Sequence, residues 1–264
     1  MDIRQPQRPD ARENPVFTRS PRRTSSPIVE LRQYTLHPGQ RDVLIALFEQ
    51  QFIESQEAVG IEIIGQFRDL NDPNRFVWLR GFPDMPSRQA SLQAFYGGPV
   101  WKEHRDTANA TMVDSDNVLL LRPAHSEAGF ALDAAHRPQH DAPQLPPGLI
   151  VAVILSFTEP PDAGFSNVFE QTLKPILAER GASILASFVT EPSANTFPAL
   201  PVREGEQVFV WFSRFQDLPA YRNHENALAG SADWNEAWST VAHRLKAQPE
   251  TLLLQPTARS LLHG

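Results

Sequence analysis

Five side chains in the first half of the sequence could together bind a small ligand. They are Glu30, Arg32 and Tyr34 in one predicted strand and Trp78 and Arg80 in another. Side chains alternate between the two faces of a strand, so the members of each group share a face. Guanidinium groups bind carboxylate and carbonyl oxygen atoms, and phenol and indole rings stack on flat ligands. These residue types predict a site for a small anionic or carbonyl-bearing aromatic ligand.

A predicted helix adds a second group of candidates. Trp101, His104 and Arg105 are three and four residues apart, which places them on one helix face. An unperturbed imidazole pKa near ~6.5 suits His104 to act as a general base at neutral pH, and Arg105 could bind an anion. Core packing of Trp101 and partial exposure of His104 are the structural alternatives. The candidate catalytic residues are therefore His104, Arg80 and Tyr34.

The composition argues against several functional classes. The 31 acidic and 24 basic residues give a net charge of −7, whereas nucleic acids and anionic membranes require an excess of Lys and Arg. The sequence has no cysteine, which removes disulfides and thiolate chemistry and fits a cytoplasmic location. No apolar run approaches the ~20 residues of a membrane helix. Phosphate-binding, dinucleotide-binding and zinc-protease motifs are missing as well, so we expect no metal and no cofactor.

Two Pro-rich segments divide the chain of 264 residues. Residues 1–27 contain five prolines, six arginines and three acidic residues, which predicts a disordered tail. Residues 124–148 show neither a helical nor an alternating period, which predicts a linker. The remaining segments, residues 28–123 and 149–264, are long enough to form one domain each.

These two segments carry the same sequence pattern. Sliding the chain by 133 residues matches 14 of 47 positions over residues 77–123, including Trp78 with Trp211 and Trp101 with Trp234. The earlier parts match at an offset near 121, which predicts an insertion of about twelve residues in one hairpin of the second half. A repeat of this length predicts two domains of one fold.

Each half is predicted to have the element order βαββαβ. In the first half we expect a strand over 28–36, a helix over 38–59, strands over 61–70 and 75–82, then helical segments and a last short strand. Asp84 and Asp217 each precede a proline and are expected to cap a helix. This order is typical of the ferredoxin-like arrangement, whose helices cover one face of a sheet. We therefore expect an α+β protein of two tandem ferredoxin-like domains whose bare sheet faces form an intramolecular α/β-barrel.

The polar side chains of the two strands are expected to face the interior of this barrel. An unpaired buried ion costs several kcal/mol, so Glu30 should pair with Arg32 or Arg80, and one positive charge remains for a ligand. The alternative is a network that only fixes strand register, or charges that reach water at the barrel mouth. The second half favours a ligand site, because its equivalent positions lack these groups. The equivalents of Glu30, Arg32, Tyr34 and Arg80 are Val151, Val153, Leu155 and Ser213.

The segments VELRQYTLHPGQ (29–40), RFVWLRGF (75–82) and YGGPVWKEHR (96–105) resemble the NIPSNAP family. The resemblance covers residues 28–123 and is fainter in the second half, whose first strand lacks the Glu-x-Arg-x-Tyr pattern. It implies a place in the dimeric α/β-barrel superfamily, in which two ferredoxin-like units form a barrel. That superfamily includes small monooxygenases, haem-dependent peroxidases and EthD-like proteins. The resemblance therefore implies a fold more than a reaction.

Three functional hypotheses follow. The first is a NIPSNAP-like protein that binds a small molecule in a pocket formed chiefly by the first half. The second is a cofactor-independent enzyme that resembles the monooxygenases or isomerases of the superfamily, with Arg80 and Tyr34 polarising a carbonyl and His104 moving a proton. The third is an interaction or scaffold protein that docks through residues 1–27. A homo-oligomer is compatible with all three, and none involves nucleic acid or a membrane.

Overall fold

The computed structural model of the chain describes residues 23–24, 26–132, 137–139 and 145–263. Almost all of the expected tail, and part of the expected linker, lie outside these residues, so the disorder of the tail stays a prediction. Within the described residues, no helix combines the length and the apolar character needed to cross a membrane.

The first half has the expected order of elements. They are β2 (Ile28–Leu36), α1 (Arg41–Leu47), a π-helical turn η1 (Phe48–Phe52), α2 (Ile53–Glu57), β3 (Glu62–Asp69), β4 (Arg75–Phe82), α3 (Met85–Gly97), α4 (Pro99–Asn109) and β5 (Met112–Pro123). The helix predicted over residues 38–59 corresponds to α1, η1 and α2 together. Two short strands, β1 (Arg23–Thr24) and β6 (Ala131–Leu132), pair with each other outside this unit.

The second half repeats this order. Its elements are β7 (Leu149–Ser156), α5 (Ala163–Val168), a π-helical turn η3 (Phe169–Leu173), α6 (Lys174–Glu179), β8 (Ser183–Thr190), β9 (Val208–Phe215), α7 (Leu218–Ala229), α8 (Ala232–Ala242) and β10 (Glu250–Pro256). Even the π-helical turns recur, and they begin 121 residues apart, which is the offset of the early part of the repeat. Both halves are therefore βαββαβ units, as the sequence predicts.

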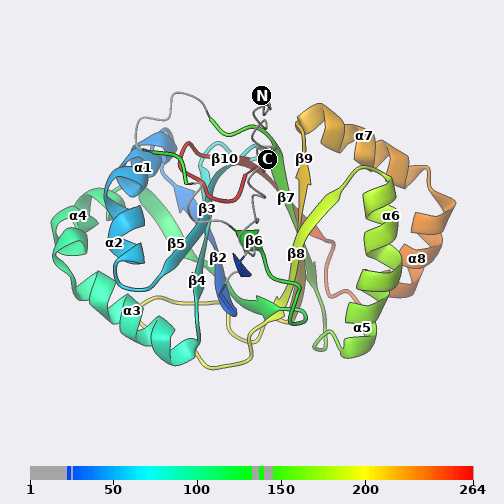
Figure 1. Cartoon of the computed structure of the whole chain (residues 1–264), viewed down its shortest axis with the longest axis horizontal. Coiled ribbons are helices and arrows are strands. Elements are labelled where there is room, and N and C mark those ends of the chain that lie inside the picture. Colours follow the sequence, from blue (N-terminus) through cyan, green and yellow to red (C-terminus); the bar gives the residue numbers. More distant parts are fainter. Residues whose placement is uncertain (1–22, 25, 133–136, 140–144, 264) are drawn as a thin grey trace, which may run out of the picture.

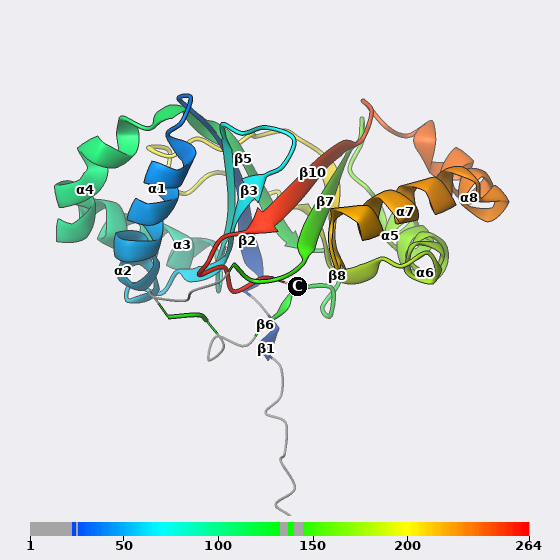
Figure 2. The ribbon, with the colours of Figure 1, turned by 90° about the horizontal axis from the view of Figure 1, so that it is seen from above.

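Eight strands of the described chain close into one antiparallel barrel in the order β10-β3-β4-β2-β5-β8-β9-β7. Each half contributes four neighbouring strands, and the halves join where β5 pairs with β8 and where β10 pairs with β3. The helices of the two halves lie on opposite outer sides of the barrel (Figures 1 and 2). The expected fold of two tandem ferredoxin-like units in an intramolecular α/β-barrel is thus confirmed.

The interior of the barrel is filled with apolar side chains from both halves. Inward-facing residues of the first half include Val29, Leu31, Val77 and Leu79, and those of the second half include Ile150, Ala152, Val210 and Phe212. Phe130, from the segment predicted to be a linker, is 1% exposed and belongs to the same core. A barrel of eight strands is just wide enough for side chains to fill it. The interior is therefore a packed core.

The candidate polar residues lie on the other face of the sheet, so the expectation that they line the barrel interior is wrong. Tyr34 and Trp78 pack with Phe48 and Phe52 of the first helical segment, beneath the helices. Period-two alternation shows which side chains share a face, but it does not show which face turns inward. The apolar interior would give a buried ion no partner, whereas the helix side brings polar residues of the helices within reach.

The insertion predicted in the second half is present between β8 and β9. Residues 191–207 join these strands, whereas residues 70–74 join β3 and β4, and the difference equals the predicted insertion of about twelve residues. This longer connection, called the inserted joint below, runs along β5 of the first half. The N–H groups of Glu191 and Arg203 donate to the carbonyl oxygens of Leu120 and Val118 at 2.9 and 2.8 Å.

Local sequence sets the ends of the helices. The carboxylates of Asp84 and Asp217 each accept a hydrogen bond from the backbone N–H three residues ahead, at 2.6 and 2.8 Å, so both caps form as predicted. Gly60 and Gly181 end the first helical segment of each half at φ values of +89° and +96°. A side chain is strained in this left-handed conformation, and glycine is not.

We expect Gly181→Ala to lower the free energy of unfolding by about 1–2 kcal/mol. The added methyl would meet no atom within 4 Å, so the cost comes from the backbone conformation alone. Gly97→Ala is the matched control, because it also has open space but no left-handed φ. It lies in α3, where alanine should be neutral or stabilise by up to about 1 kcal/mol. Equal destabilisation of both variants in urea unfolding would contradict this account.

Candidate functional site

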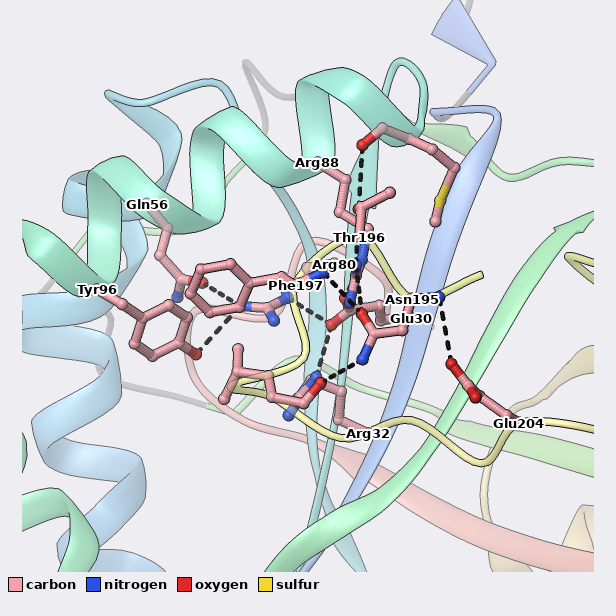
Figure 3. A network of polar contacts seen from close by, with 12 residues as sticks. Glu30, Arg32, Gln56, Arg80, Arg88, Tyr96, Asn195, Thr196, Phe197 and Glu204 are labelled. Carbon is pink, nitrogen blue, oxygen red and sulfur yellow. Dashed lines mark hydrogen bonds and ion pairs between the residues drawn. The ribbon is translucent and has the colours of Figure 1, made fainter. Parts of the chain in front are cut away.

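One buried carboxylate, Glu30 on β2, holds three buried arginines (Figure 3). Its Oε2 accepts hydrogen bonds from Arg32 Nη1 and Arg80 Nε, both at 2.7 Å, and its Oε1 accepts from Arg88 Nε at 2.6 Å. All four side chains are at most 1% exposed. Glu30 and Arg80 are register partners on β2 and β4, and Arg88 reaches them from α3. This arginine cluster therefore ties two strands to a helix.

The arginine cluster holds two more positive charges than negative ones. Among the described residues, Glu30 is the one acidic residue that forms an ion pair with Arg32, Arg80 or Arg88. Arg80 Nη2 and Arg88 Nη2 are buried and have no hydrogen-bond partner there. The expected pairing of Glu30 with Arg32 or Arg80 occurs with both residues. The charge left over is two rather than one, because of Arg88.

Arg88 is the functional candidate that sequence reasoning missed. It lies on the buried face of α3, in line with Met85, Leu92 and Phe95. The buried face of an amphipathic helix is normally apolar, and charged residues occupy the opposite face. A basic residue within this apolar stripe is the signal that could have identified it.

Uncharged groups accept hydrogen bonds from other guanidinium nitrogen atoms of the cluster. Arg32 Nε donates to Tyr34 Oη at 3.0 Å. Arg80 Nη1 donates to Gln56 Oε1 at 3.2 Å and to Tyr96 Oη at 3.4 Å. These contacts satisfy individual N–H groups but leave the excess positive charge in place.

The inserted joint of the second half covers the cluster. Arg88 Nη1 donates to Asn195 Oδ1 at 3.0 Å and to Thr196 Oγ1 at 3.2 Å, across more than a hundred residues of sequence. Phe197 stacks on Tyr96, with 5.9 Å between the ring centroids and 24° between the planes. Figure 3 shows these side chains gathered around the arginines. The site thus contains residues from both halves, which sequence reasoning had not anticipated.

An aromatic cavity lies beside the cluster, between the sheet and the helices of the first half. It has a volume of about 30 Å³. Tyr34 and Trp78 of the sheet line it, together with rings from the helical segments and Gln56. The helical rings are those of Phe48, Phe52, Phe95, Tyr96 and Trp101. Trp78 Nε1 is buried without a hydrogen-bond partner among the described residues, and Arg80 Cζ lies 5.0 Å from the centroid of the Trp78 ring.

Tyr34 presents a protonated phenol to this cavity. Burial raises the pKa of Tyr34 above its ordinary value of 10.0, although Arg32 beside it acts in the opposite direction. The hydroxyl therefore keeps its proton at neutral pH. Because the oxygen accepts from Arg32 Nε, the proton of Tyr34 is available for donation to a ligand.

The three candidates on the predicted helix, Trp101, His104 and Arg105, lie in different surroundings. Trp101 lines the aromatic cavity with the strand residues. The ring of His104 packs edge-on against Phe52, with 6.3 Å between centroids, and His104 is not part of the cavity wall. The side chain of Arg105 is 56% exposed and pairs with Asp106, its neighbour in sequence. The structure therefore brings Trp101 to the site and places His104 and Arg105 outside it.

The cluster makes the free energy of unfolding fall as the solution becomes acidic. Burial alone would raise the pKa of Glu30, but Arg80, Arg32 and Arg88 together hold it far below its ordinary value of 4.5. A depressed pKa in the folded state means that the stabilising contribution is complete above the pKa of the unfolded state. It is lost progressively as the pH falls below that value.

We expect Glu30→Gln to lower the free energy of unfolding by about 3–5 kcal/mol at neutral pH, because three buried guanidinium groups lose their counter-ion. The difference from the wild type should shrink below about pH 4.5, where the unfolded wild type takes up a proton that the folded form does not. Urea unfolding across acid and neutral pH measures this difference. Glu103→Gln, at an exposed position, is the control and should show little change. A pH-independent difference for Glu30→Gln would contradict the role of its charge.

The whole barrel is similar in fold to solved structures of low sequence identity. A presumed monooxygenase from Fusobacterium nucleatum subsp. nucleatum is 11% identical, with a TM-score of 0.55 over 91% of this chain and 96% of that one. A presumed monooxygenase from Lactobacillus acidophilus is 15% identical, with a TM-score of 0.53 over 90% of this chain and 100% of that one. An anthrone oxidase-like protein is 13% identical, with a TM-score of 0.55 over 90% of this chain and 95% of that one. At these identities the likeness concerns the fold alone.

Comparison at the level of sequence identifies the first half. No curated protein matches the chain. The NIPSNAP family model matches residues 29–127, which span β2 to β5 and include Glu30 and its three arginines. The match to the NIPSNAP family model therefore covers the part of this chain that holds the arginine cluster and the aromatic cavity, and the second half lies outside it.

Proposed function

We propose that the first half binds a small aromatic anion, either a carboxylate or the enolate or phenolate form of a carbonyl-bearing aromatic compound. One observation carries the proposal. Three buried donor nitrogen atoms, Arg80 Nη2, Arg88 Nη2 and Trp78 Nε1, have no acceptor among the described residues. A buried donor without a partner is costly, and charged oxygen atoms are the acceptors that guanidinium groups bind most strongly.

The charge of the cluster favours an anion over a neutral ligand. Three guanidinium groups face one carboxylate, so two positive charges are held away from water without a counter-ion. Taking a charge out of water costs several kcal/mol, which a nearby opposite charge partly offsets. A ligand anion would supply that opposite charge. The positive electrostatic potential of the three guanidinium groups would also stabilise the ionised form of the ligand.

The size of the cavity requires a wall side chain to move when a ring enters. A volume of about 30 Å³ holds about two water molecules, each of which needs roughly 10–15 Å³, and is too small for an aromatic ring. Tyr96 is half-buried, and its hydroxyl accepts from Arg80. In this proposal Tyr96 turns outward, and an oxygen atom of the ligand replaces its hydroxyl beside Arg80.

Calorimetric titration with benzoate tests the proposal. The wild type is expected to bind benzoate and to bind benzamide, its uncharged counterpart, at least about tenfold more weakly, which corresponds to about 1.4 kcal/mol. Arg88→Gln should weaken benzoate binding by about tenfold or more and leave benzamide binding nearly unchanged. Circular dichroism melting shows whether this variant is folded.

Arg105→Gln is the matched control, because it removes a guanidinium group of the same half that is exposed and outside the site. It should leave benzoate binding unchanged. The proposal fails if the wild type does not bind benzoate, or if both variants lose affinity equally. In that case the cluster serves only to join the strands to α3.

A catalytic function is the second candidate, supported by the fold shared with two presumed monooxygenases and an anthrone oxidase-like protein. In such an enzyme Tyr34 and Arg80 would polarise a carbonyl, and a base would remove a neighbouring proton. His104 lies outside the cavity wall, and Glu30 is fully engaged by three arginines. The described cavity wall offers no other general base, which favours binding over turnover.

Oxygen uptake with anthrone separates the two candidates. Oxidation would convert the methylene carbon of anthrone to a carbonyl, with one atom of O₂ entering the product and the other leaving as water. We expect no uptake above the uncatalysed rate, because no base is placed at the cavity. An accelerated uptake that is lost in Tyr34→Phe and kept in His104→Ala would replace the binding proposal with an enzymatic one.

A further inference from the structure

The second half has an open groove between its sheet and its helices. The groove has a volume of about 170 Å³. Val151 and Val153 of β7 and Ser213 of β9 form part of its sheet side, and Tyr221 of α7 forms part of its helix side. It lies on the far side of the barrel from the arginine cluster, because the helices of the two halves cover opposite sides (Figure 2).

The groove occupies the place that the arginine cluster fills in the first half. The repeat aligns Glu30, Arg32, Arg80 and Arg88 with Val151, Val153, Ser213 and Tyr221. Three of these four replacements are shorter side chains, and all four are uncharged. The space between sheet and helices that ions fill in one half is therefore open and largely apolar in the other.

The lining of the groove is unsuited to an anion. Trp211, Trp234 and Trp238 contribute indole rings, and within the described chain no Arg or Lys lines the groove. The one carboxylate there, Glu225, accepts a hydrogen bond from Tyr221 Oη at 2.8 Å. An anionic ligand would meet a like charge and no cation, so the two halves differ in the charge they would accept.

His224 supplies a hydrogen-bond acceptor to the lining. Its Nδ1 lies 2.9 Å from the carbonyl oxygen of Arg180. Burial lowers the pKa of His224 below its ordinary value of 6.5, so the ring is neutral at pH 7. A carbonyl oxygen can only accept, so Nδ1 carries the proton and Nε2 is left with its lone pair. A ligand with an O–H or N–H group could donate to this atom.

We infer that this groove is a second ligand site, for a small uncharged aromatic molecule with a hydrogen-bond donor, of the phenol type. Engineered apolar cavities of about 150 Å³ accept benzene, so a groove of this size suits one substituted ring. A quaternary ammonium ligand is disfavoured, because Trp234 and Trp238 stack on each other with 16° between their planes. Aromatic cages for such cations place ring faces around the charge instead.

Calorimetric titration of the whole chain with phenol and anisole tests the inference. Phenol should bind, and anisole, which lacks the donor, should bind more weakly. Val153→Phe fills the groove from the sheet side and should reduce phenol affinity by about tenfold or more. Leu228→Trp fills it from α7 and should do the same, so the test does not depend on one variant folding. His224→Phe keeps an aromatic ring but should remove the preference for phenol over anisole.

The control variant is Arg105→Gln, which removes an exposed guanidinium group outside both sites and should leave phenol affinity unchanged. Val153→Phe should in turn leave benzoate binding unchanged, so failure of one site is distinguishable from failure of the other. The inference is overturned if phenol does not bind, or if neither filling variant weakens it. It is also overturned if benzoate or phenyltrimethylammonium binds this groove more tightly than phenol.

Discussion

The removal of charge from water is the constraint on which the first half of this protein depends. One carboxylate and three guanidinium groups are stable in a buried position only where each finds partners within hydrogen-bond distance. Glu30 lies where β2, β4 and α3 converge, and it accepts from all three arginines. The same requirement brings Asn195 and Thr196 of the inserted joint to Arg88. One buried acid thus connects strand register, helix position and the contact between the two halves.

Closure of the barrel separates the apolar core from the layers between the sheet and the helices. An eight-stranded barrel has little room beyond its own side chains, and both halves fill it with apolar groups, together with Phe130 of the connecting segment. Polar and aromatic side chains with unsatisfied donors lie instead between the sheet and the helices. There the helices contribute hydrogen-bond partners, such as Gln56 and Tyr96 for Arg80. The fold therefore offers one such layer on each side of the barrel.

The two layers have diverged in chemistry while the backbone has been kept. Both halves have the same order of elements and the same π-helical turns, and both cap a helix with an aspartate. Yet the arginine cluster of one half corresponds to valine, serine and tyrosine in the other. Because these side chains point away from the barrel core, their exchange changes the charge and polarity of a layer without disturbing barrel closure. Duplication within one chain allows each layer to change independently.

Local rules in the sequence were sufficient for the order of the elements, because caps such as Asp84 and stop signals such as Gly60 act within a few residues. The repeat then predicted two like units, and alternation correctly grouped Glu30 with Arg32. Alternation could not decide which face of the sheet turns inward, because a period of two is the same for both faces. Only the packed structure shows that these ions lie beneath the helices. It alone also brings Arg88 to Glu30 and Asn195 to Arg88, because contacts between distant segments arise from tertiary packing and have no local pattern.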